Sequence, residues 1–221
     1  MLNVIFEDNH LLVVEKPVNI LSQGDNTNDD DMVNLLKKYL KEKYKKPGNV
    51  FVGLVHRLDR PVGGIMVFAK TSKAASRLSE QVRNKTFKKT YKAVIHGDMK
   101  KREDNLSDYL YKDKKTNMVS VVNKNHKDAK DAKLSYKTLA SNNGFSLVEI
   151  DLQTGRPHQI RVQFSSRNHP LYGDQRYGKN VNKKGQQIAL WSYKIEIEHP
   201  TKKEKMEFIC EPPNKYPWNM F

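Results

Sequence analysis

Apolar and polar residues alternate along this chain in short blocks, a pattern that predicts many strands and few helices. Strands are expected over residues 3–6, 10–14, 50–55, 65–68, 87–95, 134–139, 145–152, 188–197 and 205–210. Asn142-Asn143-Gly144 separates two of them and is a strong hairpin signal. The pattern therefore predicts a sheet in which neighbours along the chain can pair.

Three helices are expected between these strands. The first runs from residue 32 to about 45, has an apolar stripe and starts after Asp31, a good N-cap. The second ends near residue 84 and is capped by Thr71 or Ser72. The third is expected to have Pro157 in its first turn.

The composition indicates a polyanionic partner. Lys and Arg number 40 against 25 Asp and Glu, which gives a net charge of +15 among 221 residues. Nucleic acid is the first candidate and an anionic membrane the second, but no apolar run approaches the ~18 residues of a membrane span. We expect one domain over residues 1–221, with basic loops on thin hairpins at about 98–133, and no membrane association.

The N-terminus, the cysteine and the histidines bear on the cellular location and on the disulfides and metal sites that the chain can form. The N-terminus has no basic start and no small-residue cleavage site, so a cytoplasmic protein is expected. Cys210 is the single cysteine, which excludes an internal disulfide and a thiolate metal cluster. The seven histidines show no paired metal spacing, and no metal is expected.

One acidic residue stands in a charged turn between two apolar runs. In residues 53–64 an apolar stretch breaks into a charged turn with Asp59 at its centre, between Arg57 and Arg60 and before Gly63-Gly64. Neighbouring cations favour an ionised carboxylate that can act as a nucleophile or base. The other interpretation is a turn aspartate in a surface ion-pair cluster.

Three segments in this order resemble the motifs of the RluA-type pseudouridine synthases. His56-Arg57-Leu58-Asp59 with Gly63-Gly64 resembles the first motif, residues 89–97 with Tyr91 the second, and residues 154–164 with Arg161 the third. The resemblance spans residues 7–213. It departs from the family pattern at Pro157, where threonine is commoner, and at Gln163, where histidine is commoner.

The resemblance implies an α+β fold with a mixed, mostly antiparallel sheet and flanking helices. It also implies isomerisation of uridines in structured RNA to pseudouridine, without a cofactor. Ribosomal RNA is favoured and transfer RNA possible as substrate, and nothing requires more than a monomer.

The resemblance also implies roles for single residues. Asp59 is expected to attack the ribose or remove a sugar proton, and the sequence does not choose between these routes. Arg161 is expected to keep Asp59 ionised and direct its oxygen through a bidentate fork. Tyr91 is expected to stack on uracil, to accept the proton from C5, or both.

Substrate contacts are expected from four further residues. Arg57 either fills the gap left by a flipped uridine or binds phosphate, and His56 orients the turn. Arg60 and Gln159 complete the predicted substrate-binding set.

Other functions explain the sequence less well. His-Arg-Leu-Asp also occurs in kinase catalytic loops, but no Gly-rich phosphate loop precedes it here. Glycoside hydrolysis needs two carboxylates, and only Asp59 lies in a motif. A non-catalytic RNA-binding or ribosome-assembly factor explains the charge equally well, but does not explain why Asp59, Tyr91 and Arg161 occur together.

Overall fold

The computed structural model describes residues 2–25, 27 and 29–221. Its contacts divide the chain into two compact units, Met1–Lys88 with Ser192–Glu211, and Lys89–Trp191 with Pro212–Phe221. Organisation as a single domain thus stays a prediction. The sequence also predicts an acidic loop over residues 24–31, of which residues 26 and 28 lie outside the described residues.

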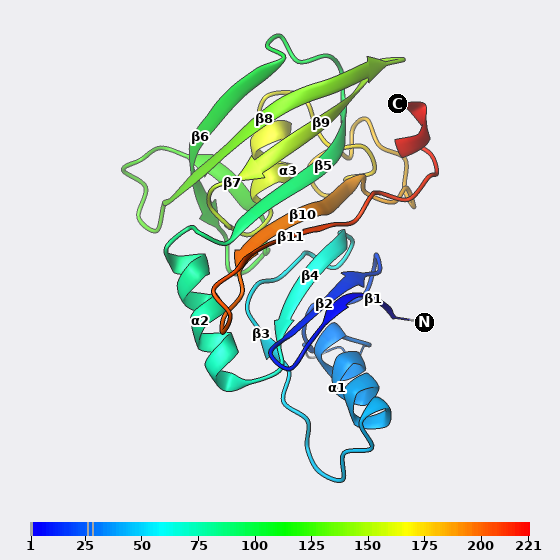
Figure 1. The fold of residues 1–221 in the computed structure, drawn as a ribbon. Coiled ribbons are helices and arrows are strands. Elements are labelled where there is room, and N and C mark those ends of the chain that lie inside the picture. Colours follow the sequence, from blue (N-terminus) through cyan, green and yellow to red (C-terminus); the bar gives the residue numbers. More distant parts are fainter. Residues whose placement is uncertain (1, 26, 28) are drawn as a thin grey trace. The chain divides into compact units, whose positions relative to one another are not determined.

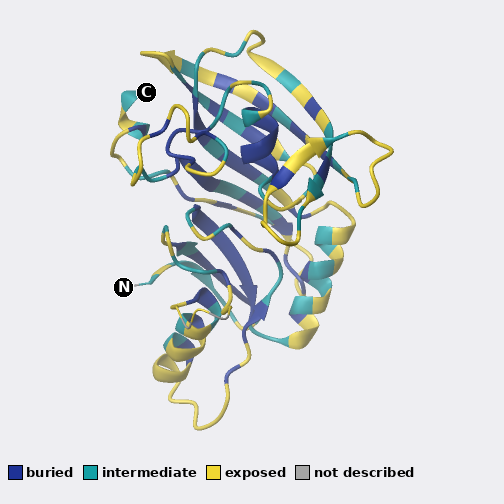
Figure 2. Cartoon of the chain, turned by 180° about the vertical axis from the view of Figure 1, so that it is seen from behind, coloured by how far each residue is buried: buried dark blue, intermediate teal, exposed yellow. Residues whose placement is uncertain are grey.

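The first unit is a small sheet with two helices (Figure 1). Its strand order is β1 (Asn3–Glu7), β2 (Leu11–Lys16), β4 (Gly63–Ala69) and β10 (Leu190–Glu198), with β3 (Gly53–Leu54) on β4 and β11 (Lys205–Ile209) on β10. The helices are α1 (Met32–Lys43) and α2 (Ser72–Arg83). All seven residues of β4 are buried (Figure 2), as expected for a continuous apolar run covered on both faces.

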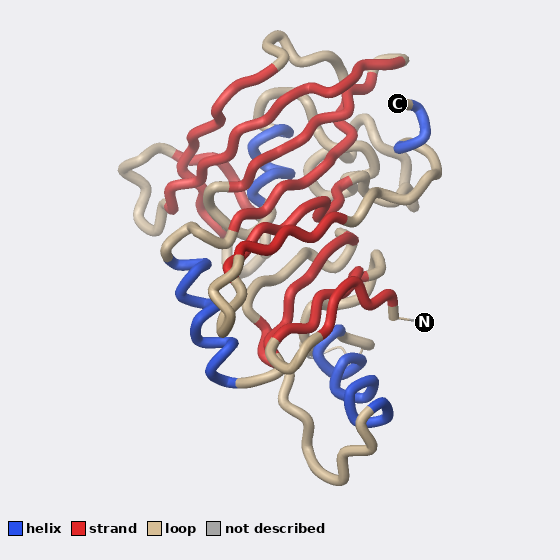
Figure 3. Tube along the Cα trace, in the orientation of Figure 1, coloured by secondary structure: helices blue, strands red, loops and turns tan. Residues whose placement is uncertain are grey.

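The second unit is an antiparallel sheet with one short helix (Figure 3). Its strands follow the order β5 (Lys88–His96), β9 (Phe145–Leu152), β8 (Lys130–Asn142), β6 (Glu103–Lys112) and β7 (Val119–Val122). Helix α3 (Gln159–Ser165) packs on β6 and β7 through a cluster of Leu110, Val119, Ala132 and Val162. A 3-10 turn, η1 (Trp218–Met220), lies near the C-terminus.

Most of the expected elements are present. The predicted N-caps are observed, because Asp31 accepts from the N–H of Asn34 and Thr71 from that of Ala74. The hairpin turn has positive φ at Asn143 and Gly144, 50° and 76°, which favours those two residue types. The α+β class with a mostly antiparallel sheet is confirmed. No described helix is long and apolar enough to span a membrane.

Several predicted elements have different bounds, and β8, for example, runs over Lys130–Asn142 where residues 134–139 were expected. The strand expected over residues 50–55 is reduced to Gly53–Leu54, which pair only with the end of β4 at Ala69 and Phe68. The third helix starts at Gln159, because His158 before it is left-handed with φ 51° and separates Pro157 from the helix. The position of the helix itself was predicted correctly.

A buried carboxylate connects β1 to α1. Glu7 accepts hydrogen bonds from the hydroxyls of Tyr39 and Tyr44 and from the ammonium groups of Lys43 and Lys70, at 2.6–2.9 Å. Its side chain is 7% exposed. Burial raises the pKa of Glu7, but the bonds from Lys43, Lys70 and the two tyrosines outweigh burial and lower the pKa to about 2.

We predict that Glu7 makes the stability of the protein sensitive to acid. The pKa of Glu7 is about 2 in the folded state and 4.5 ordinarily, so the unfolded chain binds its proton more readily. The stabilisation is fully present above about pH 4.5 and is lost as the pH falls toward 2. Denaturant unfolding at a series of pH values should show the wild type and Glu7→Gln converging as the pH decreases.

The exposed Glu80 on α2 provides the control. Glu80→Gln should change the free energy of unfolding by little at every pH. A difference between wild type and Glu7→Gln that stays constant from pH 6 to pH 2.5 would contradict this role of Glu7.

Candidate active site

The connection between β3 and β4 carries four predicted site residues, His56, Arg57, Asp59 and Arg60. Asp59 is half-buried, whereas Arg57 and Arg60 are exposed and His56 is buried. The connection begins and ends in the first unit.

The residues on both sides of Asp59 are anchored through their backbone. The hydroxyl of Ser22 donates to the carbonyl of Leu58 at 2.7 Å and accepts from its N–H at 3.0 Å. The carbonyl of Arg60 accepts from Lys16 Nζ at 3.0 Å, and the carbonyl of Asp59 accepts from the N–H of Val62 at 3.0 Å. Asp59 is therefore held on a rigid segment, as a catalytic carboxylate requires.

Lys16 anchors the connection from inside the unit. Its side chain is fully buried, and its ammonium group donates to the carbonyls of Pro17, Ile20 and Arg60 at 2.9, 2.6 and 3.0 Å. Burial lowers the pKa of Lys16 to about 7, although the negative charge of Asp59 opposes this. The sequence pattern does not single out Lys16, which follows Glu15 just beyond the apolar run at residues 11–14.

Two other residues of the connection, His56 and Arg60, have partners in the first unit. His56 Nε2 accepts from the N–H of Val67 at 3.0 Å, and its ring packs against Phe87, which fits the predicted role in orienting the turn. Arg60 forms an exposed ion pair with Asp29 at 2.8 Å. Contacts of His56, Arg57 and Arg60 with a substrate stay predictions.

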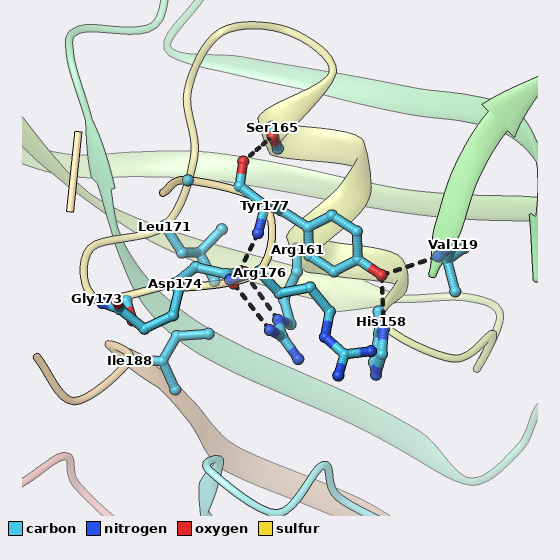
Figure 4. Close-up of polar contacts among 12 residues, drawn as sticks. Val119, His158, Arg161, Ser165, Leu171, Gly173, Asp174, Arg176, Tyr177 and Ile188 are labelled. Carbon is cyan, nitrogen blue, oxygen red and sulfur yellow. Dashed lines mark hydrogen bonds and ion pairs between the residues drawn. The ribbon is translucent and has the colours of Figure 1, made fainter. Parts of the chain in front are cut away.

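Arg161 in the second unit forms a buried ion pair. Its Nε and Nη2 each donate to one carboxylate oxygen of Asp174 at 2.8 Å (Figure 4). The two side chains are 7% and 0% exposed. This parallel geometry is a bidentate fork, and its partner is Asp174, whereas the expected fork was to Asp59. A contact between Arg161 and Asp59 stays a prediction.

Asp174 is fixed by its own backbone surroundings. One carboxylate oxygen also accepts from the N–H groups of Arg176 and Tyr177 at 2.9 and 3.1 Å. Burial raises the pKa of Asp174, but the bonds from Arg161 and these two N–H groups lower it overall. Gly173 has φ 74°, and a Cβ there would lie 2.2 Å from the carbonyl oxygen of Gln187, so the turn requires glycine.

Tyr177 covers the guanidinium of Arg161. The Cζ atom of Arg161 lies 5.2 Å from the centre of the Tyr177 ring, within cation–π distance. The hydroxyl of Tyr177 accepts from the N–H of Val119 at 3.0 Å and lies 2.7 Å from His158 Nδ1. Its carbonyl accepts from the hydroxyl of Ser165 at 2.6 Å. Neither Asp174 nor Tyr177 was among the predicted site residues, because both follow the third motif at residues 154–164.

The remaining predicted residues of this unit lie in packed surroundings. Tyr91 is 6% exposed on β5, opposite Ile150. The side-chain oxygen of Gln159 accepts from the Thr154 hydroxyl and the Arg156 N–H, and its amide donates to the carbonyl of Lys133. These contacts show how Gln159 shapes the turn before α3, and its role in substrate binding stays a prediction.

Gln163, one of the two departures from the family pattern, forms hydrogen bonds in the interior of the second unit. Its side chain is fully buried, and its amide donates to a carboxylate oxygen of Asp108 at 2.7 Å and to the carbonyl of Ala132 at 3.3 Å. The amide thus links α3 to β6 and β8.

Comparison with solved structures identifies the class of protein. The human RNA pseudouridylate synthase domain containing 4 matches with a TM-score of 0.78 over 96% of this chain and 88% of that chain, at 20% identity. The human RNA pseudouridylate synthase domain containing 1 matches with a TM-score of 0.76 over 98% and 85%, at 22% identity. The chain therefore has the fold of a pseudouridylate synthase domain.

Comparison of sequences identifies the family. The model of the RNA pseudouridylate synthase family matches residues 10–166, so the chain belongs to that family, and the resemblance to RluA-type synthases is confirmed. A Bacillus subtilis relative, named an uncharacterized RNA pseudouridine synthase, is 35% identical over 90% of this chain. The ribosomal large subunit pseudouridine synthase D of Borreliella burgdorferi is 32% identical over 96% of this chain. The chain spans 65% and 66% of the lengths of these two relatives.

We predict that Lys16→Met loosens the Asp59 connection. The substitution leaves three carbonyls without their shared donor. A buried acceptor that loses its donor costs about 1–3 kcal/mol, so the free energy of unfolding should fall by about 3 kcal/mol. Denaturant unfolding measures this loss, and amide hydrogen exchange at residues 58–62 should accelerate. Lys73→Met, at an exposed lysine of α2, should change neither quantity appreciably. Equal effects of the two substitutions would contradict the anchoring role of Lys16.

Proposed function

We propose that this protein isomerises uridines in structured RNA to pseudouridine. The observation that carries the proposal is the family match over residues 10–166, which includes Asp59 on an anchored connection and Arg161 in a fixed ion pair. The reaction breaks the bond from N1 of uracil to C1′ of the ribose and forms a bond from C5 to the same carbon. The hydrogen of C5 leaves as a proton and N1 gains one, so neither oxidant nor cofactor is needed.

Asp59 is the proposed catalytic group. Its carboxylate either attacks C1′ or removes a sugar proton to give a glycal, and both routes require an oxygen held in one direction. The anchors on Leu58 and Arg60 support that requirement. Arg161 is the proposed cation that keeps the carboxylate ionised and directs it. A guanidinium with a bidentate partner is suited to this role, because two parallel hydrogen bonds restrain its orientation.

Tyr91 and Arg57 are proposed to handle the uridine base. The ring of Tyr91 suits stacking on uracil, and its phenol is a candidate acceptor for the C5 proton. A uridine in a folded RNA must leave its stack before Asp59 can reach the sugar. Arg57 is exposed on the same connection as Asp59, which suits a side chain that takes the place of the flipped base or binds phosphate.

Ribosomal RNA is our favoured substrate, with transfer RNA as the second candidate. Two relatives from Buchnera aphidicola, each 31% identical to this chain, are named ribosomal large subunit pseudouridine synthase C, and the Borreliella burgdorferi relative carries a similar name. We further propose that the protein acts as a monomer in the cytoplasm.

Recognition of RNA is proposed to use the basic loops of the second unit. The loops at residues 113–118 and 123–129 hold the exposed lysines Lys114, Lys115, Lys124 and Lys127. The first loop is connected to the Arg161 site, because Arg176 donates to the carbonyl of Asn117 at 3.0 Å. Phosphates bound there would lie along the unit that holds Arg161.

We predict that catalysis requires Asp59. RNA with tritium at C5 of uridine should release tritium with the wild-type protein and show no detectable release with Asp59→Asn, whereas Arg161→Lys should slow release by about a hundredfold. Asp29→Asn removes an exposed carboxylate that pairs with the neighbouring Arg60, and should retain release within threefold. Tight RNA binding without release by the wild type would favour a non-catalytic RNA-binding factor instead.

We predict that the basic loops supply phosphate contacts. A quadruple variant with Gln at Lys114, Lys115, Lys124 and Lys127 should bind RNA more weakly. The slope of the logarithm of the RNA association constant against the logarithm of the salt concentration should become less steep by about 3, since each phosphate contact contributes ~0.7–0.9 to that slope. Filter binding at several salt concentrations measures the slope. Four exposed lysines on and after α1 form the matched control, Lys37, Lys38, Lys41 and Lys45. Equal slopes for both quadruple variants would contradict a specific role of the loops.

A further inference from the structure

The ion pair between Arg161 and Asp174 uses only one edge of the guanidinium. Nε and one hydrogen of Nη2 point to the carboxylate. A guanidinium carries five N–H hydrogens, and the hydrogens along its other edge, on Nη1 and Nη2, lie outside this pair. Asp174 therefore determines the direction in which that second edge points without occupying it.

Stability alone does not account for such a pair. Burial of two charges costs several kcal/mol per ion, and well-packed apolar residues of similar volume are often equally stabilising. The second unit contains a similar pair in which Arg167 donates to both oxygens of Asp108 at 2.9 and 3.1 Å, but those side chains are 31% and 13% exposed. The Arg161 pair is more deeply buried, and Arg161 itself lies in the segment 154–164 that matches the third motif.

Tyr177 restrains the guanidinium from a second direction. Its ring lies over the Cζ atom, while Asp174 lies at the edge of the guanidinium (Figure 4). The phenol oxygen at the tip of the ring accepts from the N–H of Val119, and the backbone carbonyl of Tyr177 accepts from the hydroxyl of Ser165, so side chain and backbone of Tyr177 are both held. Edge and face of the guanidinium are thus fixed by different groups.

We propose that Asp174 and Tyr177 are positioning residues that orient Arg161 for the isomerisation. The proposal rests on the proposed function. Neither residue needs to touch the RNA; both act through Arg161, whose second edge they direct toward an anionic acceptor in the reacting complex. Misplacement of a catalytic group by about 1 Å can cost a factor of ~100 in rate.

The decisive measurement is the single-turnover rate of tritium release at saturating enzyme. This rate describes chemistry in the bound complex, so a fraction of unfolded enzyme does not change it. Asp174→Asn keeps the shape and an oxygen for the N–H groups of Arg176 and Tyr177 but removes the charge. We expect a loss of about a hundredfold in this rate, with RNA affinity within threefold of wild type.

Asp108→Asn is the matched control. It removes one carboxylate from the comparable pair with Arg167, and we expect its single-turnover rate to stay within threefold of wild type. Equal losses for Asp108→Asn and Asp174→Asn would overturn the proposal, because the effect would then belong to any ion pair of this unit.

A second pair of variants decides the question if Asp174→Asn does not fold. Tyr177→Phe keeps the ring over Arg161 and loses the hydroxyl, whereas Tyr177→Leu also loses the ring. We expect the rate of Tyr177→Leu to be at least tenfold below that of Tyr177→Phe. Equal rates for these two variants would overturn the role of the ring.

Combination with Arg161→Ala tests whether both residues act through Arg161. In that background, Asp174→Asn and Tyr177→Leu should cost less than threefold further. Additive losses would overturn the proposal while leaving the proposed function intact. Absence of tritium release from the wild-type protein would overturn both, and it would be visible before any variant is assayed.

Discussion

A cation can be buried in a protein only where fixed acceptors take up its hydrogens, and this requirement shapes both units of the chain. Lys16 is enclosed by three backbone carbonyls, and Arg161 is held by the two oxygens of Asp174. In each case the acceptors belong to loops that would otherwise have more freedom. The buried charge therefore fixes the conformation of a loop as well as its own position.

The backbone on both sides of Asp59 is held in place, and the proposed reaction needs a fixed orientation there. The carbonyl of Arg60, which Lys16 binds, belongs to the residue after Asp59, and Ser22 binds the residue before it. Asp59 can thus remain half-buried and accessible while its backbone is fixed. A carboxylate on a mobile loop would lose much of the rate advantage that comes from orientation.

The basic residues serve two separate purposes. Lys16 and Arg161 lie in the interior, have fixed partners and organise the loops around them. Most of the net charge of +15 comes from exposed lysines and arginines, which are suited to contacts with RNA phosphates. Interior cations can set geometry because water does not compete for their hydrogens, whereas exposed cations attract a polyanion without fixing its position.

Local patterns in the sequence predict much of the fold and the motif residues. Strand periodicity, the caps Asp31 and Thr71 and the turn at Asn143-Gly144 depend on neighbours within a few residues, so they can be read from the chain directly. The length of β3 could not be predicted, because it depends on which residues of β4 remain available for pairing. The partners of the buried cations were also outside the reach of sequence analysis.

The sequence by itself therefore determined the family, the order of the elements and the identity of the candidate reactive groups. Only the tertiary structure decided that Asp174 holds Arg161 from 13 residues away and that Lys16 holds the carbonyl of Arg60 from 44 residues away. The physical reason is that an ion pair or hydrogen bond between loops leaves no periodic signal in the sequence. Such contacts arise from the path of the backbone after the sheets have formed.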